Sequence, residues 1–546
     1  MKTVFYKFFI LLMLALIAAN SWAQSEMPKT SIPYKGGNSV LYGGDIIVDD
    51  QSAQDQRGNC LAVAFNGWLY AAHMINNTTP KSWTVMMSTD DGLTWNTIIN
   101  NPISTDWYTV ALDIMVCGMS TADLKLYVAR IYENDITVSS ELKLVQYDAN
   151  DGTELSTLRD DIVYSGDRFV DVAIASDYYF PAWSAGQYSI GMAYSKTTPS
   201  IDYIGFISYG DAGASPQPDQ NVYAGGMFVR NVAVAYGRSA TYLNGRYHVA
   251  WEERTYSSDD IGQIWTAHTV STYNDSFTTP LRLENLVSAS AGYCRNPSIS
   301  CQFNNTDNGS GNYTEIVLFD RAYNGNTADF DIIGTYNLAA SNTDSWSIFG
   351  MDASIATSDY EPDINFDPAF NNFLVTYYNS TETKLRYLVQ YMDLPDPYNW
   401  IVIFDKYNYD DNLVNPYPKV EINPVYIQVA HLWTCERPGG NGETTFDAEY
   451  STAGIQPAAN DQFRLRAYPN PANSIVRIAM TLSQEDRITV KIMDAFGKSG
   501  NILFEGNVPK GESVINADVS GMAAGCYLYT VQSATATSTG RLVIIR

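Results

Sequence analysis

Histidine, cysteine and basic residues are scarce in this sequence, and each shortage excludes a class of function. Only four histidines and six cysteines occur in 546 residues, and none of them shows the close spacing of a zinc site. The formal net charge is −26, whereas nucleic-acid binding normally needs a basic face. We therefore expect no bound metal, no other cofactor and no nucleic-acid partner.

The six cysteines are scattered and do not form the framework of a disulfide-stapled domain. Most of them lie within short apolar, strand-like runs, which favours buried free thiols. A disulfide between Cys294 and Cys301 is left open, because an oxidising compartment would permit it. The cysteines are Cys60, Cys117, Cys294, Cys301, Cys435 and Cys526.

Long apolar runs are missing as well, except near the N-terminus. Two lysines precede twelve apolar residues from Phe8 to Ala19, and small residues stand at Ser21 and Ala23, the −3 and −1 positions of a cleavage after Ala23. A transmembrane helix needs about 20 apolar residues. The shorter run therefore predicts a signal peptide over residues 1–23, and no transmembrane segment is expected after it.

What the sequence has in abundance is β-forming residues. It contains 39 Tyr, 21 Phe and 11 Trp, and its short apolar runs are separated by Gly, Asn, Asp and Pro, a pattern typical of strands and turns. The chain is too long for one compact core. Charge indicates a boundary near Phe463, because residues 463–546 carry a net charge of +3 and residues 24–462 carry −31.

The last part of the chain is predicted to be a small Ig-like β-sandwich over residues 463–546, after a linker at 456–462. Apolar and polar residues alternate from Ile488 to Met493, so one face of this strand is buried. The opening and the turns of the sandwich are marked by Tyr468, Pro469, Asn470, Pro471, Gly497, Gly525 and Tyr527.

In this order, the marked residues resemble the C-terminal sorting domain (type A) of the type IX secretion system. The resemblance implies handling by the type IX secretion machinery. It also implies passage through the periplasm to the outer cell surface or the extracellular space, usually with removal of the tail. Whether the product is anchored or released is left open.

The region between the signal peptide and the linker, residues 24–455, contains a repeat. Similar strands rich in small residues begin at residues 57, 107, 168, 230, 295, 361 and 417. Further strands follow each start, so each unit predicts four antiparallel strands. Radial repetition of such units predicts an all-β fold, a β-propeller of seven blades with six as the alternative. Residues 40–48 would then close the ring as the outermost strand of the last blade.

One turn in the first unit carries a longer motif, Ser-x-Asp-x-Gly-x-Thr-Trp, formed around Ser88, Asp90, Gly92 and Trp95. We expect Asp90 to accept hydrogen bonds from the turn, Gly92 to adopt positive φ, and Trp95 to pack between blades. The motif resembles the Asp-box, or BNR repeat, of sialidase-like propellers. The resemblance implies a structural role for these residues.

Four repeat units open with an arginine, and these are the candidate ligand-binding residues. Because inner strands of a propeller begin near its axis, the four guanidinium groups would converge on one mouth of the central channel and bind a carboxylate or sulfate. The alternative is that each pairs with an acidic residue of the neighbouring blade. The arginines are Arg57, Arg168, Arg230 and Arg295.

Three functions are compatible with these features. The first is an exported propeller that binds an extracellular glycan or protein. The second is a sialidase-like exo-glycosidase acting on an anionic sugar, with catalytic residues unknown, because that family's aspartate acid/base and its Tyr-Glu nucleophile pair match no motif in this sequence. The third is a structural or adhesin scaffold. Whether the chain is an enzyme is left open.

Overall fold

The computed structural model describes most of the chain from Ile46 to Ile544. Within these bounds it leaves out 52, 119, 135, 165, 178–187, 226–227, 239–244, 256–261, 271–274, 284–292, 303–312, 323–325, 327–328, 338–345, 353–357, 368–371, 392–400, 408–412, 414–415, 424–427, 437–439, 451–465, 469–474, 483, 495–498, 523–524 and 534–536. The expected signal peptide, the expected linker and most of the sorting-domain opening lie outside the described residues.

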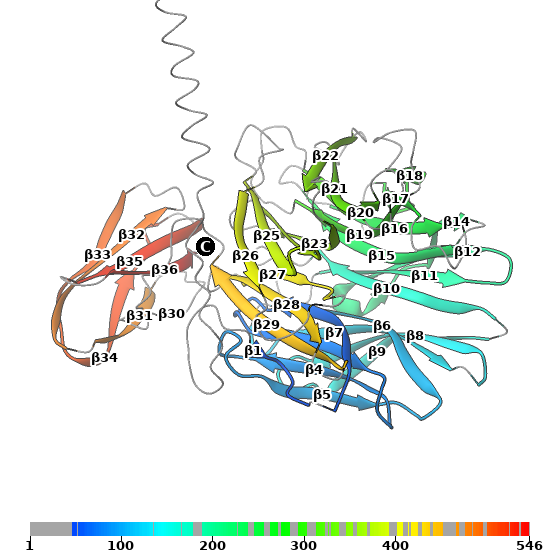
Figure 1. Cartoon of the computed structure of the whole chain (residues 1–546). Helices are drawn as coiled ribbons and strands as arrows, with labels where there is room; N and C mark the ends of the chain where they lie inside the picture. Colours follow the sequence, from blue (N-terminus) through cyan, green and yellow to red (C-terminus); the bar gives the residue numbers. More distant parts are fainter. Residues whose placement is uncertain are drawn as a thin grey trace, which may run out of the picture. The chain divides into compact units, whose positions relative to one another are not determined.

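The described part of the chain is built from strands, with a single short 3₁₀ helix, η1 (Asp211–Gly213) (Figure 1). The first sheet contains β2 (Gln56–Val63), β3 (Leu69–Ile75), β4 (Ser82–Ser88) and β5 (Asn96–Pro102). The second contains β6 (Trp107–Cys117), β7 (Lys125–Asn134), β8 (Ser139–Asp148) and β9 (Glu154–Val163). The third contains β10 (Arg168–Ser176), β11 (Ile190–Thr197), β12 (Asp202–Gly210), β13 (Ser215–Pro216) and β14 (Gln220–Gly225).

Four further sheets follow in the same manner. The fourth contains β15 (Phe228–Gly237), β16 (Arg246–Arg254), β17 (Gln263–His268) and β18 (Leu281–Arg282). The fifth contains β19 (Cys294–Cys301), β20 (Glu315–Ala322), β21 (Phe330–Asn337) and β22 (Trp346–Asp352). The sixth contains β23 (Asp359–Asp367), β24 (Asn372–Asn379), β25 (Lys384–Tyr391) and β26 (Ile401–Tyr407). The seventh contains β27 (Lys419–Asn423), β28 (Gln428–Glu436), β29 (Gly442–Tyr450) and β1 (Ile46–Ile47).

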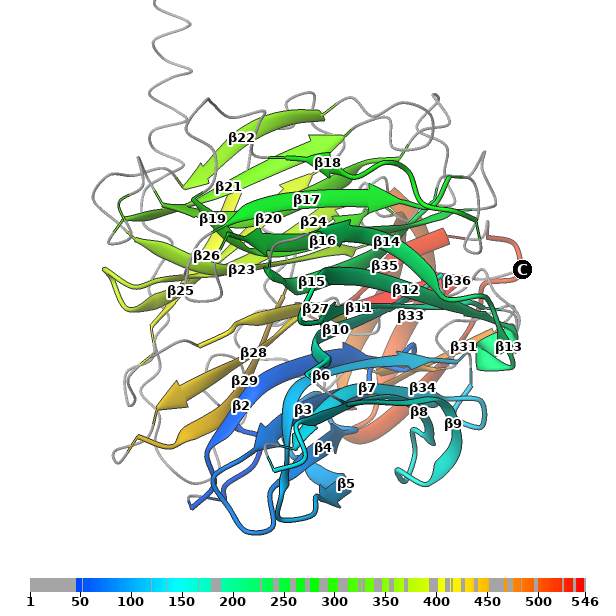
Figure 2. The ribbon, with the colours of Figure 1, turned by 90° about the vertical axis from the view of Figure 1, so that its right-hand side faces the viewer.

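The first strands of these sheets form a closed ring. Each contacts the first strand of the next sheet, from β2 to β6 and onward to β27, and β27 contacts β2. Strand β1 joins the seventh sheet from the other end of the region, because Ile46 pairs with Phe446 in antiparallel register (Figure 1). Strands β28 and β29 of that sheet lie beside β2 of the first sheet (Figure 2). The predicted all-β propeller class is confirmed, and closure by residues ahead of the first unit is confirmed for Ile46–Ile47.

The sequence pattern of each strand follows its place in the sheet. The second strand of the second sheet, β7, is buried over nearly its whole length because neighbouring sheets cover both of its faces. The outermost strand, β9, has mostly exposed and half-buried residues. All seven predicted unit starts fall within two residues of the first residue of a first strand, so each repeat unit supplies one sheet.

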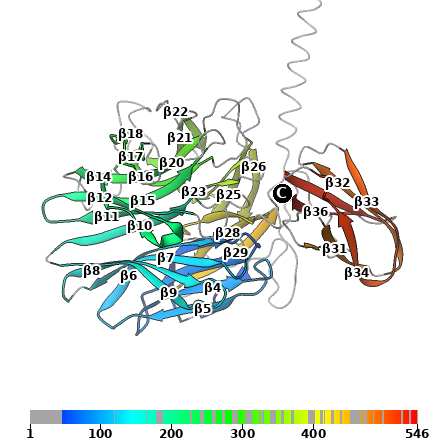
Figure 3. The same cartoon turned by 180° about the vertical axis from the view of Figure 1, so that it is seen from behind.

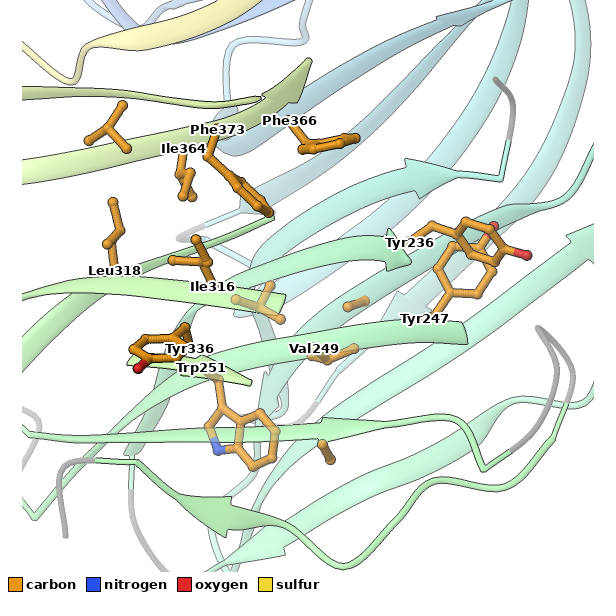
Figure 4. Packing of buried hydrophobic residues seen from close by; sticks show 14 of the residues in the cluster. Tyr236, Tyr247, Val249, Trp251, Ile316, Leu318, Tyr336, Ile364, Phe366 and Phe373 are labelled. Carbon is orange, nitrogen blue, oxygen red and sulfur yellow. The ribbon is translucent and has the colours of Figure 1, made fainter. Parts of the chain in front are cut away.

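The core lies between neighbouring sheets and is rich in aromatic side chains. Figure 4 shows one cluster, in which residues of the fourth, fifth and sixth sheets meet. The ring centroids of Phe206 in the third sheet and Tyr247 in the fourth are 5.2 Å apart, and those of Phe330 in the fifth sheet and Tyr360 in the sixth are also 5.2 Å apart. Such pairs stabilise by about 0.5–1.5 kcal/mol beyond the area they bury. The abundance of aromatic residues is therefore largely explained by packing between sheets.

The described tail residues form two further sheets (Figure 3). One contains β30 (Arg466–Tyr468), β31 (Ile475–Leu482) and β34 (Gly511–Asp518). The other contains β32 (Asp486–Asp494), β33 (Ser499–Val508), β35 (Gly525–Gln532) and β36 (Thr537–Ile544). Ile488, Val490 and Ile492 are buried in a core shared by both sheets, while Thr489 and Lys491 are not buried. The predicted alternation in this strand is confirmed.

The described residues also bear on the state of the cysteines and on membrane-spanning segments. The five cysteines whose side chains are described are buried free thiols. Cys294 and Cys301 lie at opposite ends of β19, about 23 Å apart at the usual rise per residue, which is too far for a disulfide. Within the described part of the chain, no helix has the length and apolar character needed to cross a membrane.

Candidate functional site

The first strands share an irregularity close to their start. In six of them the register of pairing shifts just after the start of the strand. In four of these six, β2, β15, β19 and β23, one residue takes positive φ at the shift. A bulge of this kind re-aims the neighbouring side chains, and non-glycine residues with positive φ often mark functional positions. The residues with positive φ are Gly58, Asn231, Asn296 and Glu361, and Tyr417 just before β27 adds a fifth.

The ring of first strands surrounds a cavity of about 640 Å³, which corresponds to the central channel of the propeller. The five residues with positive φ all line it. Between apolar residues, the wall also carries five carboxylates and one lysine. These charged residues are Asp113, Asp171, Glu361, Asp363, Glu421 and Lys419.

Three wall aspartates each connect their own sheet to the next sheet of the ring. Each accepts a hydrogen bond from a backbone N–H of the following first strand, which fixes the carboxylate and joins neighbouring sheets at the channel. The bonds run from Ile174 N to Asp113 at 2.8 Å, from Val232 N to Asp171 at 2.8 Å, and from Val420 N to Asp363 at 2.9 Å.

Lys419 is the single cationic side chain among the described residues of the wall. Its Nζ lies 3.2 Å from Asp363 Oδ1, and 41% of the side chain is exposed to the channel. The attraction of Asp363 outweighs the effect of burial and raises the pKa of Lys419. The amine therefore stays charged and accessible to a ligand.

The wall carboxylates lie inside the ring, where the surrounding protein penalises ionisation. Burial raises the pKa of Asp113 to about 6 and that of Asp171 to about 7. Burial, with the nearby charges of Asp363 and Asp113, raises the pKa of Glu421 to about 8. At neutral pH some of these groups carry a proton, so the wall offers both donors and acceptors of hydrogen bonds. Such perturbed groups in a cavity are typical of functional sites.

The four predicted arginines lie next to the wall, and none of them is among the residues that line the cavity. Three of them are bound by carboxylates. Their contacts join Arg57 Nε to Asp55 Oδ1 at 2.9 Å, Arg168 Nη1 to Glu133 Oε2 at 3.2 Å, and Arg295 Nε to Asp320 Oδ2 at 3.0 Å. Only Arg168 pairs with an acidic residue of the neighbouring sheet. The ligand-binding role of the four arginines as a group stays a prediction.

The turn at Ser88 to Trp95 connects β4 to β5 and has the expected geometry. Asp90 accepts hydrogen bonds from Thr94 N at 2.9 Å and Thr94 Oγ1 at 2.6 Å. Although burial acts in the opposite direction, the hydrogen bonds from Thr94 and Ser88 lower the pKa of Asp90. Gly92 has φ of 82°. Trp95 packs edge to face on Phe446 of the seventh sheet, 5.1 Å between ring centroids.

The motif of this turn therefore serves the contact between the first and seventh sheets. None of its four predicted residues lines the cavity. Its contribution is to closure of the ring, which agrees with the structural role that the resemblance implies.

The channel carboxylates and Lys419 were not singled out from the sequence. One signal pointed to them, because Asp171, Asp363 and Lys419 occupy the same place in their repeat units, near the start of an inner strand. A polar residue recurring at an inner position of a small-residue strand faces the channel. Among the described residues, no three His, Cys, Asp or Glu side chains are grouped closely enough to hold a metal ion.

The comparison with protein families concerns the tail. Residues 466–545 match the secretion system C-terminal sorting domain. The match covers the tail alone and agrees with the resemblance found at Tyr468 and the turns that follow. The sorting tail indicates export to the cell surface or the extracellular space. No curated protein matches the chain.

Solved structures with a similar fold share little sequence with this chain. An α-L-arabinofuranosidase from Fusarium graminearum is 7% identical, with 74% of this chain and 97% of that chain covered and a TM-score of 0.42. A protein of unknown function from Dyadobacter fermentans is 10% identical, with 74% and 97% covered and a TM-score of 0.40. The sialidase of Trypanosoma rangeli is 9% identical, with 90% and 84% covered and a TM-score of 0.35. Likeness at this level assigns no substrate to the chain.

Proposed function

We propose that this chain is an exported propeller that binds an extracellular glycan in its central channel. In this proposal residues 24–455 form the binding domain, residues 456–462 the linker, and residues 463–546 the tail that the type IX secretion machinery recognises. The observation that carries the proposal is the cavity of about 640 Å³ with charged side chains converging on it. A concave site with a few oriented polar groups is the usual form of a small-ligand site.

The chemistry of the wall favours a ligand rich in hydroxyl groups. Ionised carboxylates accept hydrogen bonds from hydroxyls, and Lys419 and the protonated carboxylates donate to hydroxyl or ring oxygens. Because Asp113 and Asp171 are fixed by backbone N–H groups of the next sheets, these acceptors are already oriented before a ligand enters. Such preorganisation lowers the entropic cost of binding.

A glycan array probed with the full-length chain, tail included, tests this proposal, followed by calorimetric titration of the glycans that bind. Lys419→Met and Asp171→Asn should each weaken binding at least tenfold, because each removes a polar contact inside the cavity. Lys510→Met is the matched control, since Lys510 is exposed in the tail, and it should bind like the wild type. Wild-type affinity in both wall variants would refute the channel as the binding site.

Hydrolysis is a second candidate, favoured by one specific arrangement. Tyr108 Oη donates to Glu133 Oε2 at 2.7 Å, and Arg168 Nη1 lies 3.2 Å from the same oxygen. A Tyr-Glu pair beside an arginine is what a sialidase-like nucleophile would need. The pair was missed in the sequence because Tyr108 and Glu133 lie on adjacent strands.

Turnover of a fluorogenic sialoside separates the two candidates. If the chain is a glycosidase, the wild type releases the fluorophore and Tyr108→Phe loses at least a hundredfold in kcat, because the hydroxyl nucleophile is absent. Binding on the array with no release of fluorophore supports the binding function.

A further inference from the structure

Arg230 differs from the other predicted arginines in having no partner within the part of the chain that the structure describes. Its Nε is buried and makes no hydrogen bond, whereas the corresponding groups of Arg57 and Arg295 each donate to a carboxylate within 3.0 Å. A buried guanidinium donor without an acceptor costs roughly 1–3 kcal/mol. An external acceptor at this place would therefore be stabilising.

The acidic residues near Arg230 are engaged elsewhere. Glu252 accepts from Asn231 Nδ2 at 2.6 Å and from Asn296 N at 3.2 Å, and it also forms a close ion pair with Arg254. Asp202 accepts from Val229 N at 3.3 Å and from Thr198 N at 3.3 Å. Their charges reach Arg230, but none of them forms an ion pair with it.

A second guanidinium adds to the positive charge at this place. Burial and the nearby charge of Arg254 lower the pKa of Arg230, against the attraction of Glu252, Asp202 and Asp171. Because Arg254 is itself paired with Glu252, Arg230 is the guanidinium left to bind an anionic group. An oxyanion would accept its hydrogen bonds and offset the repulsion from Arg254. The domain around them is strongly acidic, so this positive spot stands out.

The position of Arg230 connects this spot to the cavity. The next residue, Asn231, has positive φ and lines the cavity, and Asp171 of the wall lies within electrostatic reach of the guanidinium. A ligand in the channel therefore has Arg230 at the edge of its site, beside hydroxyl-binding carboxylates.

We propose that Arg230 binds an oxyanion, a carboxylate or a sulfate, of a saccharide whose uncharged part occupies the channel. This inference rests on the proposed function and narrows it to acidic glycans. It assigns the anion to one unpaired arginine with Arg254 beside it. The other three predicted arginines are held by carboxylates.

The test is a titration of the full-length chain, tail included, with sodium sulfate and, separately, sodium glucuronate, at constant ionic strength set with chloride. At least one of the two anions should bind the wild type saturably, and Arg230→Gln should weaken that binding at least tenfold. Arg230→Lys, which keeps the charge but loses the planar fork, should fall between them. The arm that responds distinguishes sulfate from carboxylate. If neither anion binds the wild type, or if Arg230→Gln binds as the wild type does, the proposal is wrong.

Two controls keep the result interpretable. Arg487→Gln removes an exposed arginine that pairs with Glu505 in the tail and should leave anion binding unchanged. Arg230→Gln should melt at or above the wild-type temperature, because the substitution breaks no ion pair and removes a like charge near Arg254. A marked fall in melting temperature would contradict the unpaired state of Arg230.

Failure here is distinguishable from failure of the proposed function. Neutral glycans bound through Lys419 with no anion effect would leave the proposed function intact and overturn the role of Arg230. Anion binding through Arg230 without any glycan bound in the channel would overturn the proposed function and leave Arg230 as an anion site with no saccharide attached to it.

Discussion

The propeller and the sorting tail are both made of antiparallel strands, but they bury different kinds of side chain. In the described tail, the core consists of apolar residues around Val490 and Ile492, and no polar or charged side chain is buried. In the propeller, Glu252, Glu315 and Asp320 have no exposed surface. The described tail thus buries only apolar side chains, whereas the ring of sheets also buries charged side chains that bind backbone N–H groups of its inner strands.

The largest effect is expected from Asp320→Ala. Asp320 accepts hydrogen bonds from Arg295 Nε at 3.0 Å, Asn296 Nδ2 at 2.9 Å and Glu361 N at 2.9 Å. Its removal leaves a charged and two neutral donors unpaired, at a cost of about 3–5 kcal/mol. Chemical denaturation followed by tryptophan fluorescence measures this. The matched tail variant Asp518→Ala, which loses an exposed contact to Ser520 N, should be far milder, and equal losses would contradict the difference between the two regions.

A glycine in each region separates packing from backbone strain. Gly92 has φ of 82° and its added Cβ would meet the Phe446 ring, whereas Gly511 has φ of 100° and open space around it. Both alanine variants carry strain, but only Gly92→Ala also forces apart the first and seventh sheets, an overpacking cost of about 1–3 kcal/mol. Melting temperatures compare the two. A fall in melting temperature in Gly511→Ala as large as that in Gly92→Ala would show that the contact between the first and seventh sheets is not tightly packed.

The two regions should also respond differently to pH. In the folded chain the pKa values of Asp113, Asp171 and Glu421 are raised to about 6, 7 and 8. The folded state then binds more protons than the unfolded state between about pH 4 and 8, so stability is higher at low pH and falls as pH rises through these values.

Calorimetry from pH 5 to pH 8 follows this response. The propeller transition should shift to lower temperature as pH rises, and the tail transition should shift much less. Asp171→Asn should flatten the propeller response, since it removes one of the titrating groups. A propeller that becomes more stable over this range would show that the wall carboxylates are ionised throughout it.

The smallest effect is expected from Glu505→Gln in the tail. Glu505 pairs with Arg487 at 3.0 Å, and both side chains are largely exposed. Exposed pairs contribute less than about 1 kcal/mol, and added salt should reduce the difference further. Urea denaturation at low and high salt measures this difference in the free energy of unfolding. A loss of stability comparable to that of Asp320→Ala would contradict the difference between the tail and the propeller.

Some of these features were accessible from the sequence because they depend on short-range order. The repeat starts, the turn at Asp90 and Gly92, and the alternation from Ile488 to Ile492 are set by neighbouring residues. The predicted convergence of the arginines on the channel, in contrast, depended on the path of the backbone at the start of each first strand. The register of pairing shifts just after Arg57, Arg230 and Arg295, and none of these three arginines lines the cavity. A simple alternation of inward and outward side chains along a strand does not predict such a shift.

The channel wall needed the fold for a different reason. Asp113, Asp171 and Lys419 are ordinary polar residues in short strands, and their pKa shifts arise only when seven sheets enclose them. The pairing of Tyr108 with Glu133 likewise depends on cross-strand register. Asp171, Asp363 and Lys419 recur at equivalent positions of their units, but this recurrence does not reveal what surrounds them.

The most direct test of the channel as a ligand site is a calorimetric titration of the wild type and Lys419→Met with one glycan selected on the array. Lys419 is the single described cation of the wall, so its loss should reduce affinity at least tenfold while Lys510→Met leaves it unchanged. Unchanged affinity in Lys419→Met, with the protein folded, would mean that the glycan binds outside the channel.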